Sequence, residues 1–268
     1  MAASGKFAQP AIKTLRVGSV SYLNAKPLIH RLEDDPHIEL RLAVPAMLLD
    51  GLNSGQFDIA LLPVIDYQRL RDGRIVPSGG IGCDGPTLTV RIFSRKPIEK
   101  IDVLACDAES HTSVALARIV LAERFGVRPR LIDWSEQCPE ADAMLLIGDK
   151  VVTQEPRGFK HQLDLGAAWK ELTQKPFVFA VWTTRLGIDL GDLPERLNRA
   201  RERGLADLAD IVARHAEAHG WPADLAMKYL SVYLKFDIGP AQLEAIGLFH
   251  ELAARHSIIP KARPLVLY

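Results

Sequence analysis

The sequence contains little cysteine. Three cysteines occur in 268 residues, at Cys83, Cys106 and Cys138, and no two of them have the C-x-x-C spacing. An odd number of cysteines without paired spacing argues against a disulfide framework and against a zinc site. This usage is typical of a reducing compartment, so we expect a cytoplasmic protein that holds no metal.

Neither sign of charge is in excess, and long hydrophobic runs are missing. Thirty-three Lys and Arg residues balance thirty-three Asp and Glu residues, so no net positive field attracts nucleic acid or an anionic membrane. No window approaches the roughly 20 apolar residues of a membrane span. The first 14 residues carry Lys6 and Lys13 but no signal-peptide core, and we interpret them as a short disordered leader. We therefore expect neither nucleic acid nor a membrane as a partner.

The motifs of common cofactor and metal enzymes are also missing. The chain has no P-loop, no H-E-x-x-H and no G-x-S-x-G. We therefore expect any chemistry to proceed without a cofactor.

The chain does contain an alternation of strand and helix patterns. Short apolar runs bounded by turn residues predict buried strands, and apolar residues three and four apart predict helices between them. The predicted strands are 15–20, 38–44, 59–63, 88–94, 103–106, 130–134, 143–147 and 177–182. The predicted helices among them are 26–32, 45–54 and 114–125. This order predicts an α/β fold with a parallel sheet.

The C-terminal part of the chain changes to consecutive helices. Three helical patterns begin at or near a proline suited to the first helical turn, over 194–218, 222–236 and 240–256. Gly220 and Gly239 separate them. We expect this all-helical tail to pack onto the α/β region.

Two extended segments, 88–94 and 177–185, flank the middle of the chain and predict two lobes. The first lobe is discontinuous, formed by residues 13–96 plus 183–268. The second is inserted at 97–182. A cleft between two such lobes is a preferred ligand site, because closure removes water from the ligand.

A polar turn follows the first predicted strand. Ser21-Tyr22-Leu23-Asn24 comes after a Val-rich run and before a helical pattern. Open α/β sheets bind ligands just outside the carboxyl ends of their strands, which favours a ligand site here. Ser21 or Asn24 could instead cap the helix by accepting from its free N–H groups. This segment alone does not choose between the two interpretations.

Hydroxyl groups are concentrated at the start of the helix predicted near residue 114. Ser110, His111, Thr112 and Ser113 follow one another there. The free N–H groups and positive end of a helix bind carboxylate or phosphate. One hydroxyl suffices for capping, so the additional ones favour an anion site. A lone histidine is more often a supporting residue than a catalytic one.

Two further turns carry polar groups that could face the same cleft. Thr87 and Thr89 alternate with apolar residues, which is a weak signal because threonine is common in exposed strands. Gly148 and Asp149 end an apolar strand at its carboxyl end, although Asp149 could simply cap the next turn.

Taken together, these segments resemble the chorismate dehydratases. Six segments match in order and spacing across residues 15–182: Ser21-Tyr22-Leu23-Asn24 with Pro27, 58–63, 110–113, 145–149, Asp164-Leu165-Gly166 with Trp169, and 176–180 with Trp182. That family converts chorismate to 3-[(1-carboxyvinyl)oxy]benzoate in the futalosine route to menaquinone. It has the two-lobed fold of type II periplasmic binding proteins. The resemblance thus implies a hydro-lyase that acts on chorismate without a cofactor.

Two positions depart from the pattern of this family. The family usually has Arg where this chain has His111, and Ser where it has Thr89. Threonine keeps a hydroxyl, but histidine replaces a permanent cation in a site for a dianion. Histidine can still donate hydrogen bonds there, so residue 111 bears on which substrate the chain accepts.

The resemblance also implies roles for individual residues. Asn24 and Ser21 are the catalytic candidates, with Asn24 orienting the reacting groups. The implied substrate-binding residues are Tyr22, Thr87, Thr89, Ser110, His111, Thr112, Ser113, Gly148 and Asp149. Donors on the ring carboxylate would stabilise the charge that develops when the C3 proton is removed. The base stays open among Asp149, His111 and the enolpyruvyl carboxylate of the substrate itself.

Other functions fit parts of the same pattern. The naphthoate-forming synthase of the same pathway shares the fold, but it opens with a Ser-Pro-Cys-Pro-Asn-type motif that this chain lacks. A non-catalytic binder of a small carboxylate metabolite also fits, although we find no export or anchor signal. The effector domain of a regulator is a third option, but it would need a helix-turn-helix before the first strand, and we find no such pattern there. The oligomeric state stays open, with a homodimer as one option.

Overall fold

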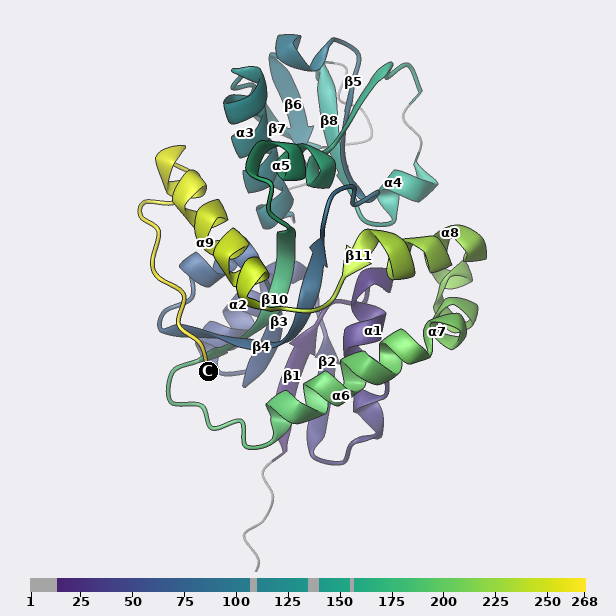
Figure 1. Ribbon diagram of the computed structural model, residues 1–268, viewed down its shortest axis with the longest axis vertical. Coiled ribbons are helices and arrows are strands. Elements are labelled where there is room, and N and C mark those ends of the chain that lie inside the picture. Colours follow the sequence, from purple (N-terminus) through teal and green to yellow (C-terminus); the bar gives the residue numbers. More distant parts are fainter. Residues whose placement is uncertain (1–13, 107–109, 135–139, 155–156) are drawn as a thin grey trace, which may run out of the picture.

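The strands of the chain form two separate sheets in the computed structural model, which describes residues 14–106, 110–134, 140–154 and 157–268 (Figure 1). The first sheet has six strands in the order β11-β4-β10-β3-β1-β2, and the second has five in the order β7-β6-β8-β5-β9. The expected leader and Cys138 lie outside the described residues. None of the described helices is long and apolar enough to cross a membrane.

The first sheet is built from both ends of the chain. Its strands are β1 (Leu15–Ser19), β2 (Ile38–Leu42), β3 (Ile59–Pro63), β4 (Gly73–Cys83), β10 (Phe177–Arg185) and β11 (Leu234–Lys235). The helices around it are α1 (Lys26–Ile29), α2 (Pro45–Ser54), α6 (Leu193–Ala206), α7 (Leu208–His215), α8 (Ala223–Lys228) and α9 (Pro240–Arg255). β1 pairs in parallel with β2 and β3, as the strand–helix–strand order predicts, and β10 runs antiparallel between β3 and β4.

The second sheet forms the upper part of the molecule in Figure 1. Its strands are β5 (Val90–Ser94), β6 (Val103–Cys106), β7 (Arg130–Asp133), β8 (Ala143–Ile147) and β9 (His161–Asp164). The helices of this region are α3 (His111–Phe125), α4 (Lys150–Thr153) and α5 (Leu165–Thr173).

The first lobe contains the six-stranded sheet and the second lobe the five-stranded sheet, so the predicted boundaries at residues 97 and 182 do not coincide with the limits of the sheets. β5, which we expected in the first lobe, pairs with β8 and β9. β10, which we expected to end the second lobe, pairs with β3 and β4. The apolar pattern of a strand indicates its burial but not its partners, and partners define the sheet.

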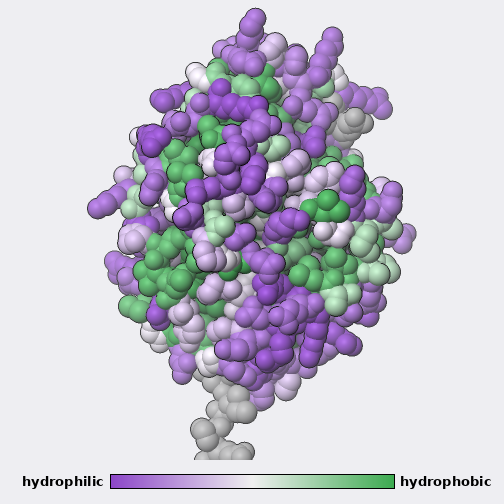
Figure 2. Space-filling model, in the orientation of Figure 1, coloured by the Kyte–Doolittle hydropathy of each residue, from purple (hydrophilic) through white to green (hydrophobic). Residues whose placement is uncertain are grey.

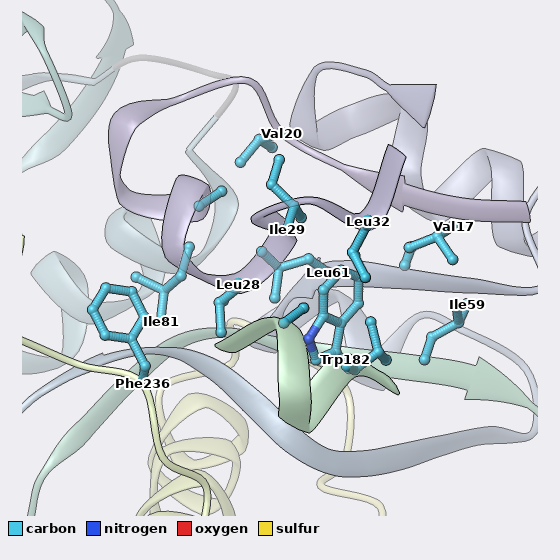
Figure 3. Close-up of a cluster of buried hydrophobic side chains, with 14 of the residues drawn as sticks. Val17, Val20, Leu28, Ile29, Leu32, Ile59, Leu61, Ile81, Trp182 and Phe236 are labelled. Atoms are coloured by element: carbon cyan, nitrogen blue, oxygen red, sulfur yellow. The ribbon is translucent and has the colours of Figure 1, made fainter. Parts of the chain in front are cut away.

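The core of the first lobe joins neighbouring strands to α1 (Figure 3). Val17, Ile59 and Trp182 come from β1, β3 and β10, and Leu28 joins the same cluster from α1. Each is fully buried, and burial of such a side chain contributes about 2 kcal/mol. This packing holds rigid the strand ends from which the polar turns emerge.

α6 covers α1 and presents its other face to solvent. Leu193, Leu197, Ala200 and Gly204 are buried at spacings of three and four residues, and Figure 2 shows a dense hydrophilic area over this helix. A Cβ atom at Gly204 would collide with the backbone of Pro27. Glycine at this position lets the two helices approach closely.

The helix predicted over 222–236 is wrong at its end, where residues 234 and 235 form a strand. α8 ends at Lys228 and continues as a π-helical turn over Tyr229–Tyr233 and then as β11, which pairs with β4. Pairing with an existing sheet edge satisfies this backbone in place of helical bonds. The turn directs Tyr229 inward, where it is fully buried.

Candidate active site

A cavity of about 350 Å³ lies between the two sheets. Its apolar wall comes from both lobes and includes Val20, Leu61, Ile81, Val90, Ile147 and Phe179. Each predicted polar turn supplies part of the remaining wall. A mostly apolar cavity with a few convergent polar groups is typical of a small-molecule site.

The structure brings the predicted site residues to this cavity, with one exception. Those that line it are Tyr22, Asn24, Thr87, Thr89, Ser110, His111, Thr112, Ser113, Gly148 and Asp149. Ser21 is exposed and does not line the cavity. Val20 and Tyr22 do line it, and successive side chains of an extended segment point to opposite sides. The same alternation directs Ser21 outward.

Tyr229 is a site residue that the sequence analysis missed. Its hydroxyl lies 2.8 Å from Oγ1 of Thr89. Burial raises the pKa of Tyr229, and hydrogen bonds with the side chains of Thr89 and Asn24 oppose that shift only in part. The phenol is therefore a neutral group. A tyrosine at core spacing in a helical pattern gives no local signal of such a role.

Two buried oxygens in the cavity wall have no hydrogen-bond partner among the described residues. They are Oδ1 of Asn24 and Oγ1 of Thr87. Buried polar atoms are nearly always hydrogen-bonded in proteins. Two such oxygens without partners in one cavity therefore indicate that a bound ligand supplies their hydrogen-bond partners. The capping interpretation of Asn24 does not hold either, because no side chain caps α1.

The start of α3 contributes the anion-binding end that its sequence predicts. Ser110 is the N-cap residue, but its side chain makes no capping hydrogen bond. Ser110, Thr112 and Ser113 are all buried, and each lines the cavity. The free N–H groups at this end and the hydroxyls around them are donors for a negatively charged ligand. Residues 107–109, just before them, lie outside the described part of the chain.

Asp149 connects the two lobes and does not cap α4 through its side chain. Its Oδ2 accepts from Nδ1 of His219 over 2.8 Å, and its Oδ1 accepts from Nε1 of Trp221 over 2.6 Å. Trp221 in turn stacks on Tyr229, with ring centroids 4.8 Å apart. Because both carboxylate oxygens already accept hydrogen bonds, Asp149 is poorly placed to act as a base.

Lys150 adds a cation to the wall of the cavity, and the sequence analysis missed it as well. It begins α4 directly after Gly148 and Asp149. Its Nζ lies 4.7 Å from the centroid of the Trp134 ring. A lysine that follows a Gly-Asp strand end was the available signal, because strand ends collect ligand groups in such folds.

The same cavity therefore combines an uncapped helix start, unsatisfied oxygens and a cation. The family model for menaquinone biosynthesis matches residues 15–255. The chain belongs to this menaquinone biosynthesis family. The chorismate dehydratase of Thermus thermophilus is similar in sequence. It is 29% identical over 235 residues, and the alignment covers 80% of this chain and 86% of that protein.

Solved structures place this family member in a periplasmic-binding-protein-like fold with two lobes. Protein AF1704 from Archaeoglobus fulgidus has a TM-score of 0.70 and 17% identity, covering 94% of this chain and 100% of that one. The alkanesulfonate-binding protein SsuA from Xanthomonas axonopodis pv. citri, bound to MOPS, has a TM-score of 0.68 and 16% identity, covering 95% and 96%. The expected fold is thereby confirmed.

Proposed function

We propose that this chain is a chorismate dehydratase, which eliminates water from chorismate to give 3-[(1-carboxyvinyl)oxy]benzoate. Membership of the menaquinone biosynthesis family and the likeness to the Thermus enzyme support the proposal. The observation that carries it is the cavity, where the uncapped start of α3 faces the unsatisfied oxygens of Asn24 and Thr87. A ligand with two carboxylates and a hydroxyl matches these groups.

The start of α3 holds one carboxylate of chorismate. Its N–H groups and the hydroxyls of Ser110 and Ser113 donate to the carboxylate oxygens, and Lys150 adds charge to the same wall. This binding fixes the ring against the apolar wall, so that the reacting carbons lie near Asn24. Ser21 has no part in this mechanism, because it lies outside the cavity.

Elimination begins with removal of the proton on C3. The electron pair left on C3 is delocalised through the diene into the ring carboxylate and then expels the hydroxyl on C4, which takes the same proton back from the base and leaves as water. Asn24 and the neutral hydroxyl of Tyr229 donate hydrogen bonds to the oxygens on which charge develops. Both oxygens of Asp149 already accept hydrogen bonds, and His111 contacts the carboxylate at the start of α3, so the proton goes to the enolpyruvyl carboxylate of the substrate.

Incubation of the purified protein with chorismate tests this proposal. We expect the ultraviolet absorbance of an aromatic product, and a mass that is lower than that of chorismate by one water. Binding of chorismate in calorimetry without turnover would instead indicate a non-catalytic binder and overturn the proposed activity. A biosynthetic role also supports a location in the cytoplasm, which cell fractionation checks.

A further inference from the structure

We propose that Asp66 is a positioning residue, which holds the imidazole of His111 so that its Nε2 faces the carboxylate bound at the start of α3. The inference rests on the proposed function for the identity of that carboxylate. Asp66 itself does not line the cavity, so it acts through His111.

Asp66 is a completely buried acid. It lies in a 3-10 turn, η3 (Val64–Gln68), directly after β3, and its side chain has no exposed surface. A buried carboxylate is costly unless charged or polar donors surround it. Two such groups reach it: Nδ1 of His111, at 2.8 Å from Oδ2 and 3.0 Å from Oδ1, and Nη1 of Arg69, at 3.1 Å from Oδ1.

These contacts determine which nitrogen of His111 carries a proton toward Asp66. An ionised carboxylate only accepts hydrogen bonds, so Nδ1 of His111 must be the donor. Nη1 of Arg69 lies 3.3 Å from the same Nδ1, but an arginine cannot donate to a nitrogen that already bears hydrogen. The remaining nitrogen, Nε2, is then the one available to a ligand.

The position of His111 directs that nitrogen to an anion. His111 is the first residue of α3, its side chain is about one quarter exposed, and it lines the cavity. When a carboxylate binds at the start of α3, Nε2 donates to it, so that each ring nitrogen of His111 has a hydrogen-bond partner. The pair Asp66–His111 thus presents a donor beside the free N–H groups of α3.

The turn that carries Asp66 is itself held firmly. Nε2 of His250 donates to the carbonyl of Val64 over 2.8 Å, and Nδ1 of His250 lies 2.8 Å from Nε2 of Gln68. Nη2 of Arg263 donates to the carbonyl of Tyr67 over 2.6 Å. A support fixed in this way preserves the orientation of the side chain that it holds.

Nitrogen NMR of the histidine side chains tests the geometry without any substrate. The chain has eight histidines, and loss of one signal in His111→Gln assigns His111. We expect a proton on Nδ1 of His111 in the wild type, and a change of tautomer in Asp66→Asn, whose amide can donate to Nδ1. A wild-type imidazole without a proton on Nδ1, or an unchanged spectrum in Asp66→Asn, would overturn the positioning role.

Kinetics with chorismate test the consequence for binding. We expect Asp66→Asn to raise KM about tenfold with little change in kcat, because it weakens a charge-assisted contact made in the bound state. In a His111→Gln background the same substitution should have no further effect on KM. An equal effect in both backgrounds would mean that Asp66 acts through folding alone.

A matched control lies at the opposite end of the same helix. Oε1 of Glu123, near the end of α3, lies 2.7 Å from Nε2 of His256, the residue after α9, and this carboxylate–histidine pair is outside the cavity. Glu123→Gln should leave KM unchanged. If the NMR result holds while chorismate is neither bound nor converted, the Asp66–His111 pair is supported and the proposed function is overturned.

Discussion

The hydroxyl of Tyr229 lies 2.8 Å from Oγ1 of Thr89, which joins the C-terminal part of the chain to the segment between the two sheets. Trp221 packs flat against Tyr229 and donates to Asp149 in the second lobe. The C-terminal region therefore does more than cover the first sheet. It builds one wall of the cavity and contacts the second lobe through two hydrogen-bonded groups.

Tyr229→Phe removes the hydroxyl and leaves Oγ1 of Thr89 without that partner. We expect kcat/KM for chorismate to fall about tenfold, since the lost contact is buried. Burial raises the pKa of Tyr229, so the phenol stays neutral and the ratio of wild type to variant should be equal at about pH 7 and 9. Tyr233→Phe, in the same turn but outside the cavity, is the control. A ratio that vanishes at the higher pH would contradict this role.

Asn24→Ala should lower turnover far more than it lowers stability. Its Oδ1 has no partner among the described residues, so the folded protein loses no contact of that oxygen, whereas the amide N–H as a donor to developing charge is worth about a hundredfold in kcat. Thermal unfolding and steady-state kinetics measure the two effects. Asn53→Ala, at an exposed position of α2, controls for the substitution itself. Unchanged kcat in Asn24→Ala would remove Asn24 from the mechanism.

Asp149→Asn should loosen the contact between the lobes. The amide cannot accept from both His219 and Trp221 as the carboxylate does. We expect weaker binding of chorismate, by about tenfold, and less compaction on binding in solution scattering. Asp142→Asn changes an equally well bonded aspartate, whose partners lie within the second lobe. Equal scattering curves for Asp149→Asn and wild type would show that this contact does not hold the lobes together.

Acid should destabilise the protein through His250. Burial lowers the pKa of this histidine to about 4 from the ordinary value of 6.5. Between these values the unfolded chain binds a proton and the folded chain does not, so stability is lost as pH falls from 6.5 to about 4. The loss is on the order of 3 kcal/mol. Denaturant unfolding at several pH values measures it, and His250→Gln should flatten the slope in this range. An equally steep slope in the variant would assign the acid sensitivity to other groups.

Gly204→Ala and Gly247→Ala should have opposite effects on stability. A Cβ at Gly204 collides with the backbone of Pro27, whereas a Cβ at Gly247 in α9 meets nothing within 4 Å. We expect the first substitution to lower the free energy of unfolding by about 2 kcal/mol or more. The second should raise it by up to about 1 kcal/mol through helix propensity. Thermal unfolding of the two variants checks both signs, and a stable Gly204→Ala would contradict the close packing of α1 and α6.

Local pattern was enough to predict several elements and most of the cavity. Four elements have the predicted bounds: the strands 59–63, 103–106 and 143–147 and the helix 45–54. Their burial pattern and their turn residues depend on neighbouring positions in the sequence, so local pattern is enough to predict them. Asn24, Ser110 and Asp149 could be proposed for one cleft because strand ends collect ligand groups whatever the details of the fold.

Pairing and long-range contacts were decided by the tertiary structure alone. The sequence of β4 predicts a loop because it contains Pro77 and several glycines. In the structure, however, a Cβ atom at Gly80 would collide with the carbonyl oxygen of Ala180, and a Cβ atom at Gly82 with the carbonyl oxygen of Phe177. Glycine is required there by the neighbouring strand, which local sequence does not reveal. Likewise, Asp66 reaches His111 across 45 positions of sequence. The local sequence around either residue does not predict this contact, because only the folded chain determines the distance between them.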